Sequence, residues 1–75
     1  MIKVYGKSNG CVKCELAKKM LEDRHIEYEF IDVMVNIEAL VYIKSLGYRQ
    51  VPVIENEGDW YTLKTLNDLL FTLGY

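Results

Sequence analysis

Two spacings of apolar residues alternate along this 75-residue chain. Short stretches rich in β-branched and aromatic residues predict strands at 2–5, 28–33, 51–55 and 60–62. In the remaining stretches, apolar residues recur every three or four positions, which predicts helices at 11–24, 37–46 and 66–73. The predicted order of elements is therefore β-α-β-α-β-β-α.

Polar residues and glycines mark the ends of these elements. A loop rich in turn-forming residues precedes the first helix, and it places Asn9 or Gly10 near the helix N-cap. Asn36 is a suitable N-cap for the second helix, and Gly47 fits its C-terminal end. The segment 56–59, with the sequence Asn-Glu-Gly-Asp, predicts a turn that joins the last two strands into a hairpin.

The helical spacing also predicts which side chains face the core. In the second helix these are Ile37, Leu40, Ile43 and Leu46. In the third helix they are Leu66, Leu69, Leu70 and Leu73. Thr65, followed three residues later by Asp68, is typical of a capping-box start for this helix, and Gly74 stops it.

This order of elements predicts an α/β fold. Two strands joined through a helix are expected to be parallel, and a hairpin then adds antiparallel strands, which gives a four-stranded mixed sheet with three helices on its faces. The length fits a single domain, residues 1–75. Apolar residues make up 51% of the chain and charged residues 27%, as in ordinary folded domains.

The charge and the distribution of apolar residues exclude several classes of function. Nine basic and eleven acidic residues give a net charge of −2, without the evident basic face that nucleic-acid binders carry. No apolar run approaches the ~18 residues that span a bilayer. Met1–Tyr5 is typical of a first strand rather than of a signal peptide. We expect a cytoplasmic monomer that binds neither nucleic acid nor membrane.

The two cysteines, Cys11 and Cys14, are too close in sequence to stabilise the fold strongly. A bridge that closes so short a loop contributes about 2 kcal/mol on the chain-entropy model. Their place at the start of a predicted helix indicates chemistry instead, because three-residue spacing puts both sulfurs on one face and helix N-termini stabilise thiolates. The positive charges of Lys7 and Lys13 nearby favour a thiolate, and the negative charge of Glu15 disfavours it.

The two cysteines are expected to have different roles. Cys14 shares the buried side of the predicted helix with Ala17 and Leu21, so Cys11 is the more accessible thiol. Cys11 is therefore predicted to attack a substrate disulfide, and Cys14 to resolve the mixed disulfide. This chemistry needs no bound cofactor, because the electrons are carried on the two sulfurs.

A zinc site and a pair of inert buried cysteines are the alternatives. Structural zinc takes four ligands. Besides the two cysteines, the only good ligand of the nitrogen type is His25, at the far end of the first helix. A metal site would therefore have to be shared with a second chain. The corresponding function is a non-catalytic metal- or partner-binding module.

The motif Cys11-Val12-Lys13-Cys14, followed by Gly47-Tyr48-Arg49-Gln50-Val51-Pro52-Val53, resembles the thioredoxin superfamily. Within it the chain is most similar to the glutaredoxin-like proteins of the NrdH type. Those proteins have Cys-Val-Gln-Cys and Gly-Phe-Arg-Gln-(hydrophobic)-Pro-Val at the corresponding places, and the resemblance covers nearly the whole chain. It implies a thioredoxin/glutaredoxin fold and a thiol–disulfide oxidoreductase that reduces protein disulfides.

The resemblance also implies how a substrate binds. In that family the proline matching Pro52 is cis and faces the dithiol, and the backbone of the residue matching Val51 pairs with the substrate. An ordinary trans turn proline is the alternative. The substrate-binding residues predicted from both motifs and their surroundings are Lys7, Val12, Lys13, Arg49, Gln50, Val51 and Pro52.

The electron source and the substrate are likewise implied by the resemblance. Redoxins of the NrdH type take electrons from thioredoxin reductase and pass them to ribonucleotide reductase. A glutathione-dependent glutaredoxin is the alternative, with Lys7 and Arg49 available to a glutathione carboxylate. Residues 60–68 lack the glycine pair that holds glutathione in ordinary glutaredoxins, so we expect weak use of glutathione.

Two further residues near the motifs have structural interpretations. Trp60 is expected to pack on the last helix, with an exposed aromatic ledge beside Tyr61 as the alternative. Asp32, at the end of the second predicted strand, is expected to cap a turn or face solvent rather than assist proton transfer at the dithiol.

Overall fold

The computed structural model describes all 75 residues and confirms the predicted order of elements. The first half of the chain consists of β1 (Ile2–Gly6), α1 (Val12–Glu22), β2 (Tyr28–Asp32) and α2 (Ile37–Ser45). The second half consists of β3 (Val53–Asn56), β4 (Asp59–Thr62), a short 3₁₀ turn (Leu63–Thr65) and α3 (Leu66–Thr72). None of the helices has the length and apolar character that a membrane crossing requires.

The four strands form one mixed sheet in the order β2-β1-β3-β4. Strand β1 runs parallel to β2 and antiparallel to β3, and β3 pairs with β4 as an antiparallel hairpin. Val4 of β1 lies between Phe30 of β2 and Ile54 of β3. The mixed four-stranded sheet predicted from the sequence is therefore confirmed.

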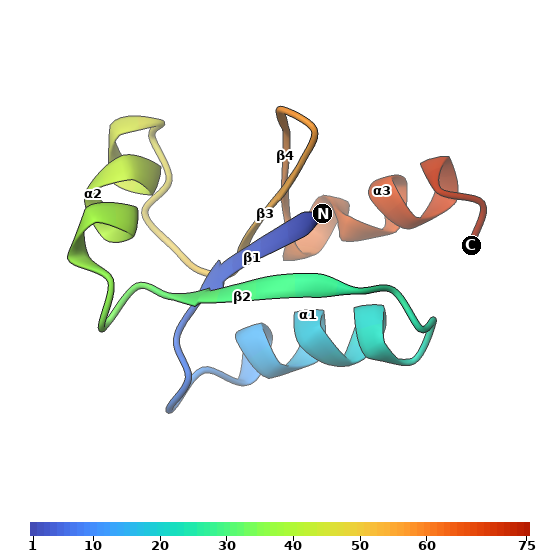
Figure 1. Ribbon diagram of the computed structural model, residues 1–75, viewed down its shortest axis with the longest axis horizontal. Helices are drawn as coiled ribbons and strands as arrows, with labels where there is room; N and C mark the ends of the chain where they lie inside the picture. Colours follow the sequence, from blue (N-terminus) through green and yellow to red (C-terminus); the bar gives the residue numbers. More distant parts are fainter.

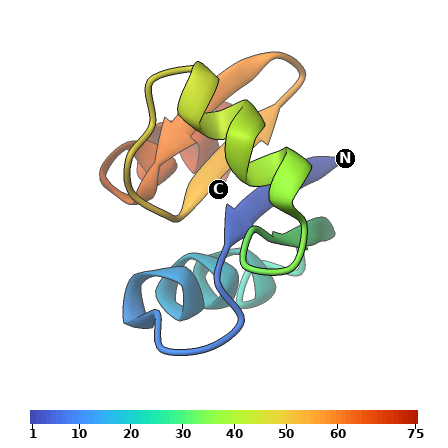
Figure 2. The same cartoon turned by 90° about the vertical axis from the view of Figure 1, so that its left-hand side faces the viewer.

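The helices cover both faces of this sheet (Figure 1). Val4 and Ile54 pack on one face against buried residues of α1 and α3, which are Ala17, Leu21, Leu66, Leu69 and Leu70. Tyr5 and Val53, their neighbours in sequence, pack on the other face with Ile43 of α2. Figure 2 shows α2 alone on its side of the strands. The alternation of side chains along the strands thus builds two separate apolar layers.

Helix α2 buries fewer residues than its sequence predicts. Ile43 is buried and Leu40 is partly buried, but Ile37 and Leu46 are exposed, so the expected stripe is wrong at both ends. The reason is geometric. Each step of three residues falls roughly 60° short of a full helical turn, so residues spaced by three drift around the helix. Ala39 completes the contact surface instead.

Several element ends also differ from the prediction. Cys11 itself, not Asn9 or Gly10, is the N-cap of α1, and the helix ends at Glu22. Strand β3 starts at Val53 rather than at residue 51.

The start and end of α3 also depart from the sequence pattern. The hydroxyl of Thr65 accepts a hydrogen bond from the backbone N–H of Thr62 (2.9 Å) and does not cap α3, because a 3₁₀ turn precedes that helix. Leu73 follows the last residue of α3 and is 40% exposed, so it does not join the buried stripe. Gly74 has φ +90°, a conformation that ends a helix and favours glycine.

Candidate active site

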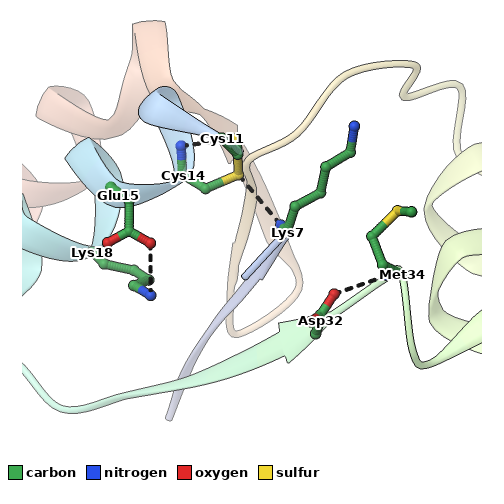
Figure 3. The surroundings of a disulfide bond; sticks show 7 residues. All are labelled: Lys7, Cys11, Cys14, Glu15, Lys18, Asp32 and Met34. Carbon is green, nitrogen blue, oxygen red and sulfur yellow. Dashed lines mark hydrogen bonds and ion pairs between the residues drawn. A yellow bond between two sulfur atoms is a disulfide. The ribbon is translucent and has the colours of Figure 1, made fainter. Parts of the chain in front are cut away.

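The two cysteines lie where β1 leads into α1, and a disulfide joins them (Figure 3). Cys11 is the N-cap residue of α1 and is partly exposed. Cys14 lies in the first turn and is completely buried, on the same side of the helix as Ala17 and Leu21. The two Cα atoms are 5.2 Å apart. Cys11 is therefore the cysteine that solvent reaches, and Cys14 is shielded from it.

Backbone N–H groups point at both sulfurs (Figure 3). The N–H of Cys14 donates to Sγ of Cys11 over 3.2 Å, and the N–H of Lys7 donates to Sγ of Cys14 over 3.4 Å. The first contact is the N-cap hydrogen bond of α1, in which sulfur takes the place of the usual side-chain oxygen. Donors at a helix N-terminus stabilise an anion, so this geometry favours a thiolate at Cys11 when the disulfide is reduced.

The charged side chains of Lys7 and Glu15 do not point at the sulfurs (Figure 3). The Lys7 side chain extends away from the sulfurs (Figure 3). Glu15, which was expected to oppose a thiolate, pairs with Lys18 over 3.2 Å. The Lys18 ammonium also lies 4.5 Å from the centre of the Phe30 ring. The carboxylate of Glu15 is therefore partly compensated by a neighbour on its own helix.

Gly6 is a site residue that the sequence analysis did not single out. A Cβ atom at Gly6 would lie 2.9 Å from Sγ of Cys14 and 3.2 Å from Cε1 of Phe30, so the last residue of β1 must lack a side chain for the sulfur to pack there. A glycine at the end of a strand, just before a loop that carries a cysteine pair, was the only sequence signal for this contact.

The segment 50–52 faces the start of α1 across a cavity of about 390 Å³. The Val51–Pro52 peptide bond is cis, as the resemblance implies, and Pro52 is buried. The residues that line the cavity are Lys13, Gln50, Val51, Pro52, Thr62, Leu63 and Lys64. Four of the predicted substrate-binding residues thus meet here, together with three residues that the sequence analysis did not name.

A second hollow, of about 270 Å³, lies on the other side of Val51. Lys7 and Arg49 line it together, far apart though they are in sequence. Its other lining residues are Val33, Met34, Leu40, Ile43, Lys44, Tyr48 and Val51. Val12, also predicted to bind substrate, is 84% exposed on α1 and lines neither space.

Asp32, at the end of β2, is hydrogen-bonded to the loop that precedes the cysteines. Its carboxylate accepts hydrogen bonds from the Ser8 hydroxyl and from the backbone N–H of Met34, the latter over 2.9 Å. These two bonds, with that of the Ser8 side chain the stronger influence, lower the pKa of Asp32 below its ordinary value. The expectation that Asp32 caps a turn is confirmed.

Trp60 packs on the α2 side of the sheet. Its ring lies 5.7 Å from that of Tyr5, 5.8 Å from that of Tyr42 and 6.0 Å from that of Tyr48. The expectation that it packs on the last helix is therefore wrong. Successive residues of β4 point to opposite faces, and it is Tyr61 that packs against the α1/α3 layer.

The chain contains no group of three or more His, Cys, Asp or Glu side chains arranged to hold a metal ion.

Comparison with known sequences gives consistent results. A family model described as glutaredoxin matches residues 2–60. The glutaredoxin-like protein NrdH of Lactococcus lactis is 32% identical over 57 residues, which are 76% of this chain and 78% of that protein. The protein of the same name from Salmonella typhimurium is 35% identical over 46 residues, and the match spans 61% of this chain and 57% of that protein's length.

Solved structures extend the likeness to the whole fold. The glutaredoxin-like protein NrdH-redoxin from Escherichia coli has a TM-score of 0.81 and 28% identity, over 91% of this chain and 92% of that one. A thioredoxin-like protein with 22% identity has a TM-score of 0.77 over 92% of this chain and 99% of its own, which supports the fold alone. The chain therefore belongs to the glutaredoxin family, within which it is a glutaredoxin-like protein of the NrdH type.

Proposed function

We propose that this protein is a thiol–disulfide oxidoreductase that reduces disulfides in other proteins. The observation that carries the proposal is the unequal pair of sulfurs at the start of α1, with Cys11 reachable at the N-cap and Cys14 buried in the first turn. Membership of the glutaredoxin family supports it. So does the Escherichia coli NrdH-redoxin, a glutaredoxin-like protein described as having a thioredoxin-like activity profile.

The reaction starts from the reduced pair. The thiolate of Cys11 attacks one sulfur of the substrate disulfide, forms a mixed disulfide with it and releases the other substrate sulfur as a thiolate, which takes up a proton. Cys14, after losing its own proton, then attacks Sγ of Cys11, and the second substrate sulfur leaves. Two electrons pass to the substrate, and the Cys11–Cys14 disulfide remains. The 5.2 Å separation of the two Cα atoms lets the second step proceed without rearrangement of the helix.

The segment that precedes β3 is proposed to hold the substrate. Val51 lies outside the strand pairing, which begins at Val53, so its backbone is free to pair with an extended peptide. The cavity between this segment and Lys13 brings such a peptide to the start of α1. Gln50 and Pro52 line the same cavity and complete its wall.

Thioredoxin reductase is the proposed electron source, and ribonucleotide reductase is the proposed acceptor. Both assignments rest on the likeness to NrdH proteins. A thiol electron carrier of this kind works in a reducing compartment, and we propose the cytoplasm.

A coupled assay tests the proposed function. The protein is supplied with NADPH and either thioredoxin reductase or glutathione plus glutathione reductase, and reduction of a protein disulfide is followed through the loss of NADPH. We expect turnover with thioredoxin reductase and little with glutathione. Turnover with the glutathione system alone would refute the proposed electron source, and no reduction of disulfides even by the chemically reduced protein would refute the oxidoreductase.

Glutathione-dependent activity is the second candidate, and one observation favours it. Lys7 and Arg49, the two side chains available to a glutathione carboxylate, line the same hollow. The same assay separates this candidate from the first.

A further inference from the structure

The hollows on both sides of Val51 are lined by charges of one sign only. Lys13 and Lys64 line the larger one, and Lys7, Lys44 and Arg49 line the smaller one. These are five of the nine basic residues of the chain, and none of its eleven acidic residues lines either space. The net charge of the chain is −2, but the surface around the proposed substrate segment is basic.

The two hollows have one lining residue in common, Val51. A peptide that pairs with Val51 therefore lies next to both of them. A third hollow, at the C-terminal end of α2, shares Lys44, Tyr48 and Arg49 with the smaller one.

The five cations are available to a partner. All are exposed, and none of them takes part in the two ion pairs of the protein, Lys18 with Glu15 on α1 and Lys19 of α1 with Asp23 just after it. Apolar side chains also line the smaller hollow, namely Val33, Leu40, Ile43 and Val51. A complementary partner therefore combines several negative charges with apolar side chains.

We propose that this surface selects disulfides that lie in acidic peptide segments. The proposal rests on the proposed function and names the class of protein substrate that the same site takes. A peptide fits better than a small anion, because the cations are spread over two hollows that apolar residues also line. The rest of the protein carries eleven acidic and four basic residues, so most of the positive charge of the chain is concentrated at the site.

Three synthetic peptides test the proposal. They have the same length, the same apolar residues and one internal disulfide, and the flanking positions carry Asp and Glu, Asn and Gln, or Lys. Reduced protein is mixed with each peptide, without any reductase, and the second-order rate of disulfide reduction is measured. At low ionic strength we expect the acidic peptide to react roughly tenfold faster than the neutral one, and this difference to shrink in about 0.5 M salt.

Charge-reversal variants show whether the basic surface causes the preference. Arg49→Glu and Lys64→Glu act on opposite sides of Val51, and each is expected to lower the rate for the acidic peptide about 3- to 10-fold and to reduce the ratio of the acidic-peptide rate to the neutral-peptide rate. Lys19→Glu is the matched control, because it changes the net charge by the same amount on α1, outside both hollows. It is expected to keep the preference.

The outcomes separate this proposal from the function on which it rests. Equal rates for the acidic and neutral peptides at low salt, or an equal loss of preference in Lys19→Glu, would overturn the acidic substrate class while leaving the oxidoreductase intact. Faster reaction with glutathione disulfide than with the acidic peptide would overturn it in favour of a small anionic ligand. No reduction of any disulfide would instead refute the proposed function.

Discussion

Replacing Gly6 by alanine tests whether the end of β1 positions the buried sulfur. The new Cβ would lie 2.9 Å from Sγ of Cys14 and 3.2 Å from Cε1 of Phe30. Favourable contacts between heavy atoms lie at about 3.5–4.0 Å, so the sulfur or the strand must move by several tenths of an ångström. Cys14 has little freedom to do so, since it is completely buried and Lys7 donates a hydrogen bond to its sulfur.

The expected loss of stability follows from two opposing contributions. Overpacking a well-packed site costs about 1–3 kcal/mol. Replacing a glycine within a strand by alanine returns about 0.5–1 kcal/mol, because the unfolded chain becomes less flexible. The central values of the two contributions differ by about 1 kcal/mol, and we expect Gly6→Ala to lower the free energy of unfolding by about that amount. With a urea m-value of about 1 kcal/mol/M for so small a protein, the unfolding midpoint falls by about 1 M.

A double-mutant cycle with Cys14→Ala assigns this loss to the sulfur. All four proteins are unfolded in urea under reducing conditions, so that no variant gains or lacks a disulfide. Without the sulfur, most of the cost of Gly6→Ala is expected to disappear, which gives a coupling energy of about 1 kcal/mol. An unchanged midpoint in Gly6→Ala, or an equal loss in the presence and absence of the Cys14 sulfur, would show that the close approach does not constrain the site.

Three further results are expected. Cys14→Ser is expected to accumulate a mixed disulfide between Cys11 and a protein substrate, visible on non-reducing gels, whereas Cys11→Ser is expected to be inactive; activity in Cys11→Ser would contradict the assigned roles. Hydrogen bonds lower the pKa of Asp32 in the folded state, so the contribution of the Asp32 carboxylate to stability is present above about pH 4 and lost as the pH falls through the lowered pKa. Urea unfolding of Asp32→Asn at several pH values is expected to lack this loss of stability in acid. Leu21→Ala is expected to lower the free energy of unfolding by about 2–5 kcal/mol, whereas Leu16→Ala, at a position 47% exposed on the same helix, has a much smaller effect in the same measurement.

The sequence predicted the order of elements because the local signals agreed with the final packing. Asn36 caps α2 through its side chain, which accepts from the N–H of Ala39 over 3.0 Å. Gly47 follows the same helix with φ +96°, as its place in the sequence predicted. The spacing of the cysteines likewise indicated their pairing and the greater burial of Cys14.

Contacts between segments far apart in sequence were not predictable in the same way. Whether Trp60 faces α2 or α3 depends on the register of β4 against β3, and a shift of one residue would reverse the two faces. Leu46 fits an apolar pattern but lies beyond the part of α2 that reaches the sheet. The larger hollow depends on the 3₁₀ turn after β4, which brings Leu63 and Lys64 beside Gln50 and has no clear local signal.

The site divides into buried positions that fix its geometry and exposed positions that are free to select a partner. Fifteen of the 75 residues are buried, and three of these, Gly6, Cys14 and Pro52, belong to the site. Substituting any of them disturbs the core as well as the chemistry, so they offer little room for tuning specificity. The exposed cations at Lys64 and Arg49 carry no such constraint, since exposed substitutions away from packed contacts usually change stability by less than about 0.5 kcal/mol. In a protein of this size, selection among partners is therefore expected to act through the charges around Val51, while the disulfide and its buried neighbours stay fixed.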